Sequence, residues 1–167
     1  RQPLSGWFGH ENPFAFTDDF SPAPDARKLL CGTTGVLGAT ALEASVDLFL
    51  KAEEDVRLNK LTQLSTVFET LIREKCESFG FDCVSPSDPE HRGAHLSFRH
   101  PDGYAIMQNL IEHGVIGDFR APDYLRFGLS PLFMSFEDLY NATEILHHIL
   151  ETQSYRDQKY QVKHAVT

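Results

Sequence analysis

This sequence of 167 residues has few basic side chains. Lysine and arginine total 15 against 24 aspartates and glutamates, which gives a formal net charge of -9. Binding to a nucleic acid requires clustered positive charge, and so does docking to an anionic membrane surface. The charge balance therefore argues against both kinds of partner. The share of hydrophobic residues, 41%, is normal for a globular fold.

Long apolar runs and cysteines are also scarce. The longest candidate for a membrane span, around residues 36–50, is interrupted by Glu43 and Asp47, so no uncharged run is long enough to cross a bilayer. The three cysteines are odd in number and irregularly spaced, which predicts neither a disulfide framework nor a zinc site. Unpaired cysteines are typical of a cytoplasmic protein.

Common catalytic motifs and a leader are missing as well. The sequence contains no G-x-S-x-G, no H-E-x-x-H and no P-loop. It begins with Arg1 instead of methionine and has no charged segment followed by an apolar one, which excludes a signal peptide at this position. We expect a chain that is joined to further sequence in mid-domain; a processed mature chain is the alternative.

The first 52 residues are expected to pack on structure built by other sequence. Residues 1–35 are rich in glycine and proline, which predicts loops with short strands at residues 14–16 and 29–31. A helix is predicted from Val36, because Leu42, Val46 and Phe49 recur at helical spacing. We expect residues 1–52 to be the end of one domain with a connecting helix.

Residues 53–167 are predicted to form a small second α/β domain, in which helices cover a mainly antiparallel sheet. A helical pattern covers residues 56–78 and ends at Gly80, and alternating apolar residues predict strands near residues 81–83, 94–98, 115–119 and 124–129. Asp102 is a candidate cap for a further helix, and Ser135 with Asp138 forms an S-x-x-D start signal for the last one. The polar tail from Ser154 is expected to fray.

Two N-terminal segments have the chemistry to hold an anion. Trp7 lies between Gly6 and Gly9, and its indole N–H is a donor only, which suits a phosphate oxygen. Residues 31–35, C-G-T-T-G, offer hydroxyls and backbone N–H groups just before a helix. Each signal also has a simpler interpretation, an aromatic plug for the tryptophan and an ordinary helix cap for the second segment.

Arg126 is the third candidate, because it lies in an otherwise apolar strand, Y-L-R-F-G-L. A buried arginine needs an anionic partner, and its planar fork can hold a carboxylate at two points. The alternative is a structural ion pair with Asp118, Asp123 or Glu137. The histidines predict no metal site, since His147 and His148 are adjacent on a helix and point in different directions.

Four segments together resemble kynureninase of the bacterial type, a member of the fold-type-I enzymes that use pyridoxal 5'-phosphate (PLP). They occur in order along most of the chain: Q-P-L-S-G-W-F-G-H with P-F-A-F, then C-G-T-T-G-V-L, then R-G-A-H-L-S-F-R-H-P-D-G-Y, and finally G-V-I-G-D-F-R-A-P-D-Y-L-R-F-G-L-S-P-L. The resemblance implies PLP-dependent hydrolysis of L-kynurenine to anthranilate and L-alanine in tryptophan degradation. The chain would comprise the end of the large domain and the whole small domain.

The resemblance also implies a role for individual residues. Trp7 and Thr33 match positions that contact the phosphate of PLP from the neighbouring subunit of a homodimer. Arg126 matches the arginine that binds the substrate carboxylate. Gly32 matches a position near the aromatic ring of the substrate, and a glycine there favours kynurenine over 3-hydroxykynurenine.

One departure from the family is the absence of its Schiff-base lysine, which lies upstream of the W-F-G-H segment. None of the six lysines has the expected context, so the chain by itself is expected to be inactive. A non-catalytic binding or dimerisation module, and a desulfurase or an aminotransferase of the same fold type, are the alternatives.

Overall fold

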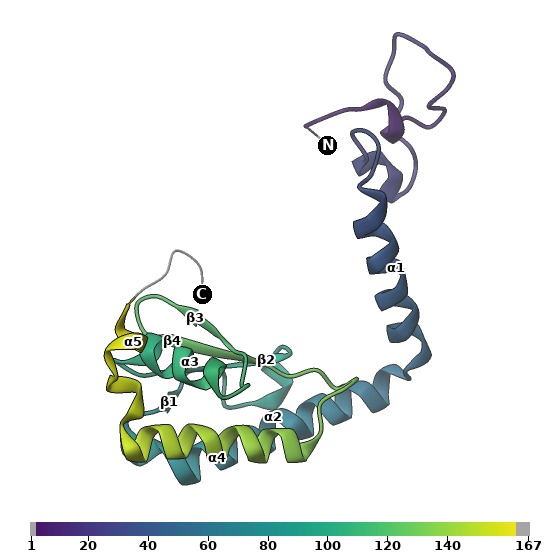
Figure 1. Cartoon of the computed structure of the whole chain (residues 1–167). Helices are drawn as coiled ribbons and strands as arrows, with labels where there is room; N and C mark the ends of the chain where they lie inside the picture. The colour runs from purple at the N-terminus through teal and green to yellow at the C-terminus, as the bar shows by residue number, and fades with distance from the viewer. Residues whose placement is uncertain (1–2, 163–167) are drawn as a thin grey trace. The chain divides into compact units, whose positions relative to one another are not determined.

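A computed structural model describes residues 3–162, and the chain divides into two compact units, Arg1–Lys51 and Ala52–Thr167 (Figure 1). We call them unit 1 and unit 2 and describe each by itself. The division falls at the start of the second long helix, where the chain leaves one set of packing contacts and enters another.

Unit 1 consists of loops, two short 3-10 helices and one long helix. The 3-10 helices are η1 (Trp7–Gly9) and η2 (Ala26–Leu29), and the long helix is α1 (Val36–Lys51). The prediction of short strands at residues 14–16 and 29–31 is wrong. The first segment forms a turn in which the Ala15 N–H donates to the Asn12 carbonyl. The second begins with the last residue of η2, Leu29, and continues as irregular chain through Leu30 and Cys31. Phe14 and Phe16 are 71% and 84% exposed, so no buried face exists on which a strand could pack.

Helix α1 confirms the prediction from helical spacing, and its apolar stripe is exposed. Leu42, Val46 and Phe49 are 64%, 44% and 46% exposed. A helix of this length gains most of its stability from packing an apolar face. The stripe is therefore a surface on which other protein is expected to pack.

Unit 2 contains a four-stranded antiparallel sheet, as predicted. The strands are β1 (Asp82–Cys83), β2 (His95–Arg99), β3 (Asp118–Arg120) and β4 (Tyr124–Gly128), in the order β1-β2-β4-β3. The third strand begins three residues later than expected. Alternation places buried and exposed side chains on opposite faces, so Leu96, Phe98, Leu125 and Phe127 all point to the inner face.

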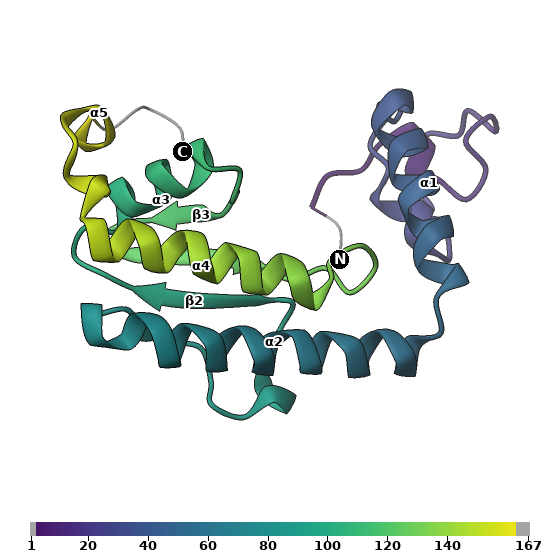
Figure 2. The same ribbon diagram turned by 60° about the horizontal axis from the view of Figure 1, so that its bottom comes forward.

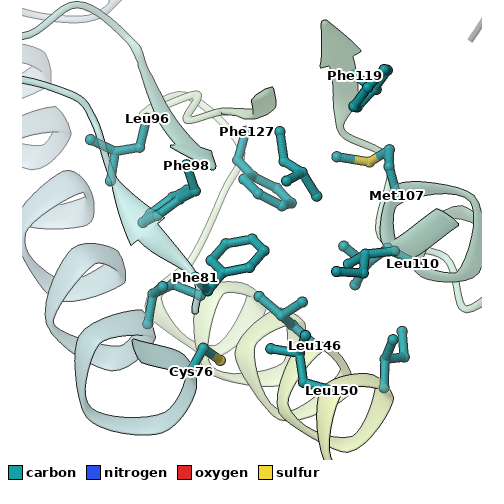
Figure 3. Packing of buried hydrophobic residues seen from close by; sticks show 14 of the residues in the cluster. Cys76, Phe81, Leu96, Phe98, Met107, Leu110, Phe119, Phe127, Leu146 and Leu150 are labelled. Atoms are coloured by element: carbon teal, nitrogen blue, oxygen red, sulfur yellow. The ribbon is translucent and has the colours of Figure 1, made fainter. Parts of the chain in front are cut away.

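The inner face of the sheet packs against α2 (Glu54–Cys76), α3 (Gly103–Glu112) and α4 (Phe136–Thr152) in one hydrophobic core. Phe81, Phe98 and Phe127 lie close together at its centre, with Leu146 of α4 and Met107 of α3 beside them (Figure 3). Helices α2 and α4 lie side by side (Figures 1 and 2). The opposite face of the sheet carries the polar residues.

The end of α2 and the start of α4 follow the sequence signals. Gly80 adopts a positive φ of 82° after α2, which glycine tolerates without a steric penalty. At the start of α4, the Asp138 N–H donates to the Ser135 hydroxyl and the Ser135 N–H donates to the Asp138 carboxylate, which completes the capping box. Asp102 does precede α3, but its side chain makes no capping hydrogen bond.

Helix α3 begins unusually close to the sheet. A Cβ atom at Gly103 would lie 2.9 Å from Leu125 Cδ1 and 3.2 Å from the Asp123 carbonyl oxygen. The absence of a side chain therefore lets the first turn of α3 contact the strand that carries Arg126.

The tail is ordered further than the sequence indicated. It forms η5 (Ser154–Arg156) and α5 (Gln158–Gln161), and Tyr155 and Tyr160 are buried. The expectation of a frayed tail from Ser154 is therefore wrong as far as residue 162. Two tyrosines in a polar segment anchor it to α3, because each buries a large ring.

His100 joins the end of β2 to the start of α3. Its ring is buried; Nε2 lies 3.2 Å from the Phe79 carbonyl oxygen, and Nδ1 accepts the N–H of Asp102 at 3.0 Å. This arrangement uses the neutral ring with the proton on Nε2. Burial lowers the pKa of His100 below its ordinary value of 6.5, although Asp102 and Asp82 oppose the shift.

We expect unit 2 to lose stability in acid because of His100. A folded-state pKa that is lowered for a base means that the unfolded state binds more protons, so the stabilising effect is complete above the unfolded pKa and is lost as the pH falls below it. The urea midpoint of the chain should therefore drop more between about pH 7.5 and pH 5 than that of His100→Gln, whose amide can make both hydrogen bonds without titrating. Equal drops in the two proteins would contradict this role.

Candidate functional site

Arg126 lies at the centre of the outer face of the sheet in unit 2. In the register of the strands, Ser97 of β2 is its partner on one side and Asp118 of β3 is its partner on the other. Its neighbours in sequence, Leu125 and Phe127, point into the core. The strand pairing therefore fixes where the arginine side chain emerges, on the face that the helices leave uncovered.

The guanidinium of Arg126 is paired with Asp118, one of the three partners considered from the sequence. Arg126 Nε donates to Asp118 Oδ2 at 2.8 Å, and Nη2 donates to the same oxygen. The two side chains are 37% and 34% exposed, so solvent and ligands can still reach them. The expected structural ion pair exists, and it does not use all the donors of the arginine.

A second ion pair lies on the same face. Arg99 of β2 donates through Nε and Nη2 to Asp123 Oδ2, at 3.0 and 2.6 Å, and its guanidinium lies 5.5 Å from the ring centroid of Tyr124. This pair has the same chemistry as Arg126 with Asp118 and a different place in the register. It therefore serves as an internal comparison for the first pair.

The loop that carries Trp7 packs against the segment before Thr33. A Cβ atom at Gly6 would lie 1.8 Å from the carbonyl oxygen of Cys31, and one at Gly9 would lie 2.9 Å from the carbonyl oxygens of Lys28 and Leu30. Only glycine permits this approach of two backbones. Unit 1 thus brings the two anion-binding segments suggested by the sequence into direct contact.

The polar groups of these segments remain available. Trp7 is 47% exposed, and its ring contacts Phe8 in a tilted arrangement and Phe14 edge-to-face, with centroid distances of 4.1 and 5.6 Å. Thr33 is exposed in the turn before α1. Among residues 3–162, neither the indole N–H of Trp7 nor the hydroxyl of Thr33 has a hydrogen-bond partner. With the first turn of α1 nearby in the chain, these donors fit a phosphate.

Gly32 is half-buried between Cys31 and Thr33. A Cβ atom at this position would meet no atom of the chain within 4 Å. Lack of space within unit 1 therefore does not explain the glycine, and other residues would fit there.

The two cysteines of unit 2 lack the lowered pKa of a nucleophilic thiol. Burial raises the pKa of Cys76 to about 12 and also raises the pKa of the half-buried Cys83. A reactive cysteine requires a lowered pKa. Cys31 is exposed, and its thiol lies 3.7 Å from the carbonyl oxygen of Leu4.

Arg92 forms a buried ion pair that the sequence did not reveal. Its side chain is 2% exposed, and Nη2 donates to Glu69 at 2.5 Å and to the Ser87 carbonyl at 3.0 Å. The partner comes from α2, 23 residues earlier, and no local pattern links the two positions. The pair closes the loop between β1 and β2 over α2.

Residues 3–162 contain neither a metal-ligand cluster nor a candidate membrane span. That part of the chain has no cluster of three His, Cys, Asp or Glu side chains that could hold a metal ion. None of its helices is both long and apolar enough to cross a membrane.

Two sequence comparisons with known proteins agree on one family. The model of the kynureninase C-terminal domain matches residues 58–146. Curated kynureninases of Pseudomonas fluorescens and of Burkholderia mallei (strain SAVP1) are 37% and 39% identical over 99% and 100% of the chain. The chain spans 40% of the length of each of these relatives.

A solved structure supports the fold. It is described as a C-DES mutant with glycine covalently linked to its PLP cofactor, and it superimposes with a TM-score of 0.66. The likeness covers 88% of this chain and 38% of the other, with 19% sequence identity. At that identity the likeness shows the α/β fold and does not extend to the reaction.

Proposed function

Because the chain belongs to the kynureninase family, we propose that it is the C-terminal part of an enzyme that hydrolyses L-kynurenine to anthranilate and L-alanine in tryptophan degradation. The observation that carries the proposal is the family match over residues 58–146, which includes Arg126 and the ion pair that holds it. The chain spans 40% of the length of its curated relatives, so the activity is proposed for the complete gene product.

PLP is the proposed cofactor, and unit 1 has groups that fit its phosphate. Trp7 would donate its indole N–H and Thr33 its hydroxyl, and the contact between Gly6 and Cys31 keeps the two segments together. When bound, PLP supplies an electron sink for the reaction at the α-carbon of the amino acid. The role of the chain in this step is to fix the phosphate and so the orientation of the ring.

Arg126 is the proposed partner of the substrate carboxylate. A planar fork with a fixed position holds an amino acid in one orientation, which a flexible point charge does less well. The outer face of the sheet presents the guanidinium among polar side chains, while the apolar core supports it from behind. Gly32 is the proposed neighbour of the aromatic ring, and we propose kynurenine over its 3-hydroxy form as the preferred substrate.

We further propose that this chain contributes no Schiff-base lysine and is inactive alone. Such a lysine must reach its neutral form, which a lowered pKa favours. Carboxylate partners act in the opposite direction on two candidates, because Glu144 raises the pKa of Lys75 and Glu112 raises the pKa of Lys159. Lys163 lies outside the described residues.

A cytoplasmic homodimer is the proposed assembly. The exposed stripe of α1, Leu42, Val46 and Phe49, offers an apolar surface for other protein. Shared sites would let Trp7 and Thr33 serve the neighbouring subunit, as the family resemblance implies. A desulfurase has less support, because it needs a reactive thiol and the thiols of unit 2 have raised pKa values.

Anthranilate release tests the function. The complete gene product that contains this chain should release fluorescent anthranilate from L-kynurenine when PLP is present, whereas the chain of 167 residues should release none. A complete gene product that binds PLP and leaves kynurenine intact would refute the proposal. Activity of the chain of 167 residues would refute the claim that none of its lysines forms the Schiff base.

A further inference from the structure

One oxygen atom of Asp118 receives two donors of the same guanidinium. Arg126 Nε donates to Oδ2 at 2.8 Å, and Nη2 donates to the same oxygen. In arginine, one N–H of Nη2 points in the same direction as the N–H of Nε, and the two form one edge of the planar group. Asp118 therefore occupies this edge, which we call the inner edge of Arg126.

Two of the remaining donors of Arg126 form a second edge. An arginine has five N–H donors in a fixed geometry, and the inner edge uses two of them. Of the three N–H groups that remain, one on Nη1 and one on Nη2 lie parallel and form this outer edge. Nη1 is not among the buried polar atoms that lack a partner. This outer edge can hold both oxygens of a carboxylate end-on.

Asp118 is itself fixed from two sides. It lies opposite Arg126 in the register of β3 and β4, and Arg120 Nε of its own strand lies 3.3 Å from the same Oδ2 atom. The three groups together carry two positive charges and one negative charge. An incoming carboxylate therefore still meets a net positive site, although Asp118 neutralises part of it.

We infer that Asp118 is a positioning residue that holds the inner edge of Arg126 and directs the α-carboxylate of an amino-acid substrate to the outer edge. The inference rests on the proposed function for the identity of the substrate and adds the geometry of its recognition. Without Asp118, the guanidinium is free to rotate and to offer either edge, so the carboxylate loses its single fixed position.

The test compares L-kynurenine with its α-carboxamide in the complete gene product. Asp118→Asn is nearly isosteric and removes the charge that holds the inner edge. We expect it to lower the preference for carboxylate over carboxamide, the ratio of the two kcat/KM values, by about tenfold, mainly through a higher KM for kynurenine. A purely structural role would change both substrates alike and leave the ratio unchanged.

Matched variants complete the design. Asp123→Asn breaks the second ion pair on the same face and should keep the wild-type ratio, and Asp118→Glu should restore part of it. In an Arg126→Ala background, Asp118→Asn should have no further effect on the ratio, because the two residues act as one unit. An unchanged ratio in Asp118→Asn, or an equal fall in Asp123→Asn, would overturn the inference.

Failure of the proposed function gives a different result. If the wild-type protein binds PLP and does not hydrolyse kynurenine, the proposed reaction is refuted. Calorimetric titration with the same two compounds then replaces the kinetic measurement. A preference for the carboxylate in binding that falls in Asp118→Asn alone still supports the positioning role. Equal preference in wild type and Asp118→Asn overturns it.

Discussion

Replacing Arg126 with lysine in the complete gene product should lower kcat/KM for L-kynurenine by about a hundredfold. Lysine keeps the positive charge, but it presents a point charge on a flexible stem in place of a planar fork. It cannot pair with Asp118 through one edge and hold a second carboxylate through another. The loss should fall mainly on KM, because the role proposed for the arginine is to bind the carboxylate and not to transfer a proton.

Arg99→Lys is the matched control for this prediction. Arg99 makes the same kind of ion pair, with Asp123, on the same face of the sheet. Its replacement should change kcat/KM by no more than about twofold, as for a charge outside the site. If both variants lose activity equally, the face as a whole supports the fold and Arg126 has no special role. Thermal unfolding of each variant reports such a general effect.

The largest loss of stability is expected from Glu69→Ala, about 3 kcal/mol. Glu69 is the carboxylate partner of Arg92, whose side chain is 2% exposed. Removing the glutamate leaves a buried guanidinium without a counter-charge, and the Arg92 Nη1 atom already lacks a hydrogen-bond partner among the described residues. Urea unfolding of the chain, followed by circular dichroism, measures the change.

Arg73 supplies the control, because it pairs with the same glutamate from the surface. Its Nη2 atom lies 2.7 Å from Glu69 Oε1, and its side chain is 61% exposed. Exposed pairs contribute little, so Arg73→Ala should change stability by less than about 1 kcal/mol. A loss of similar size in Glu69→Ala and Arg73→Ala would show that burial of Arg92 does not determine the cost.

The sequence predicted the parts of the fold that depend on local pattern. Helix α2, the positive φ of Gly80 four residues after its last residue, the capping box at Ser135 and the antiparallel sheet all follow from periodicity or from short-range hydrogen bonds. The tail was missed because its composition is polar. Two buried tyrosines, Tyr155 and Tyr160, anchor it to α3, which lies far away in the sequence.

For the candidate site, the sequence named residues and left their contacts open. Asp118 was one of three possible partners for Arg126, and strand register, which a sequence specifies only through long-range pairing, selects it. The close approach of Gly6 to Cys31 was likewise beyond local reasoning, because it joins positions 25 residues apart. The roles of Trp7, Thr33, Gly32 and Arg126 stay predictions.

The contact between Gly103 and the sheet has a consequence for genetic screens of this protein. Any side chain at position 103 would press on Leu125 in β4 and on the backbone at Asp123 in the turn before it. We expect such an allele to displace the Leu125 side chain in the core and the backbone at Asp123 by a few tenths of an ångström, and so to disturb the strand that carries Arg126 without touching substrate or cofactor. In a screen for inactive alleles, position 103 would thus be scored beside the catalytic positions, and only a measurement of folding would separate them.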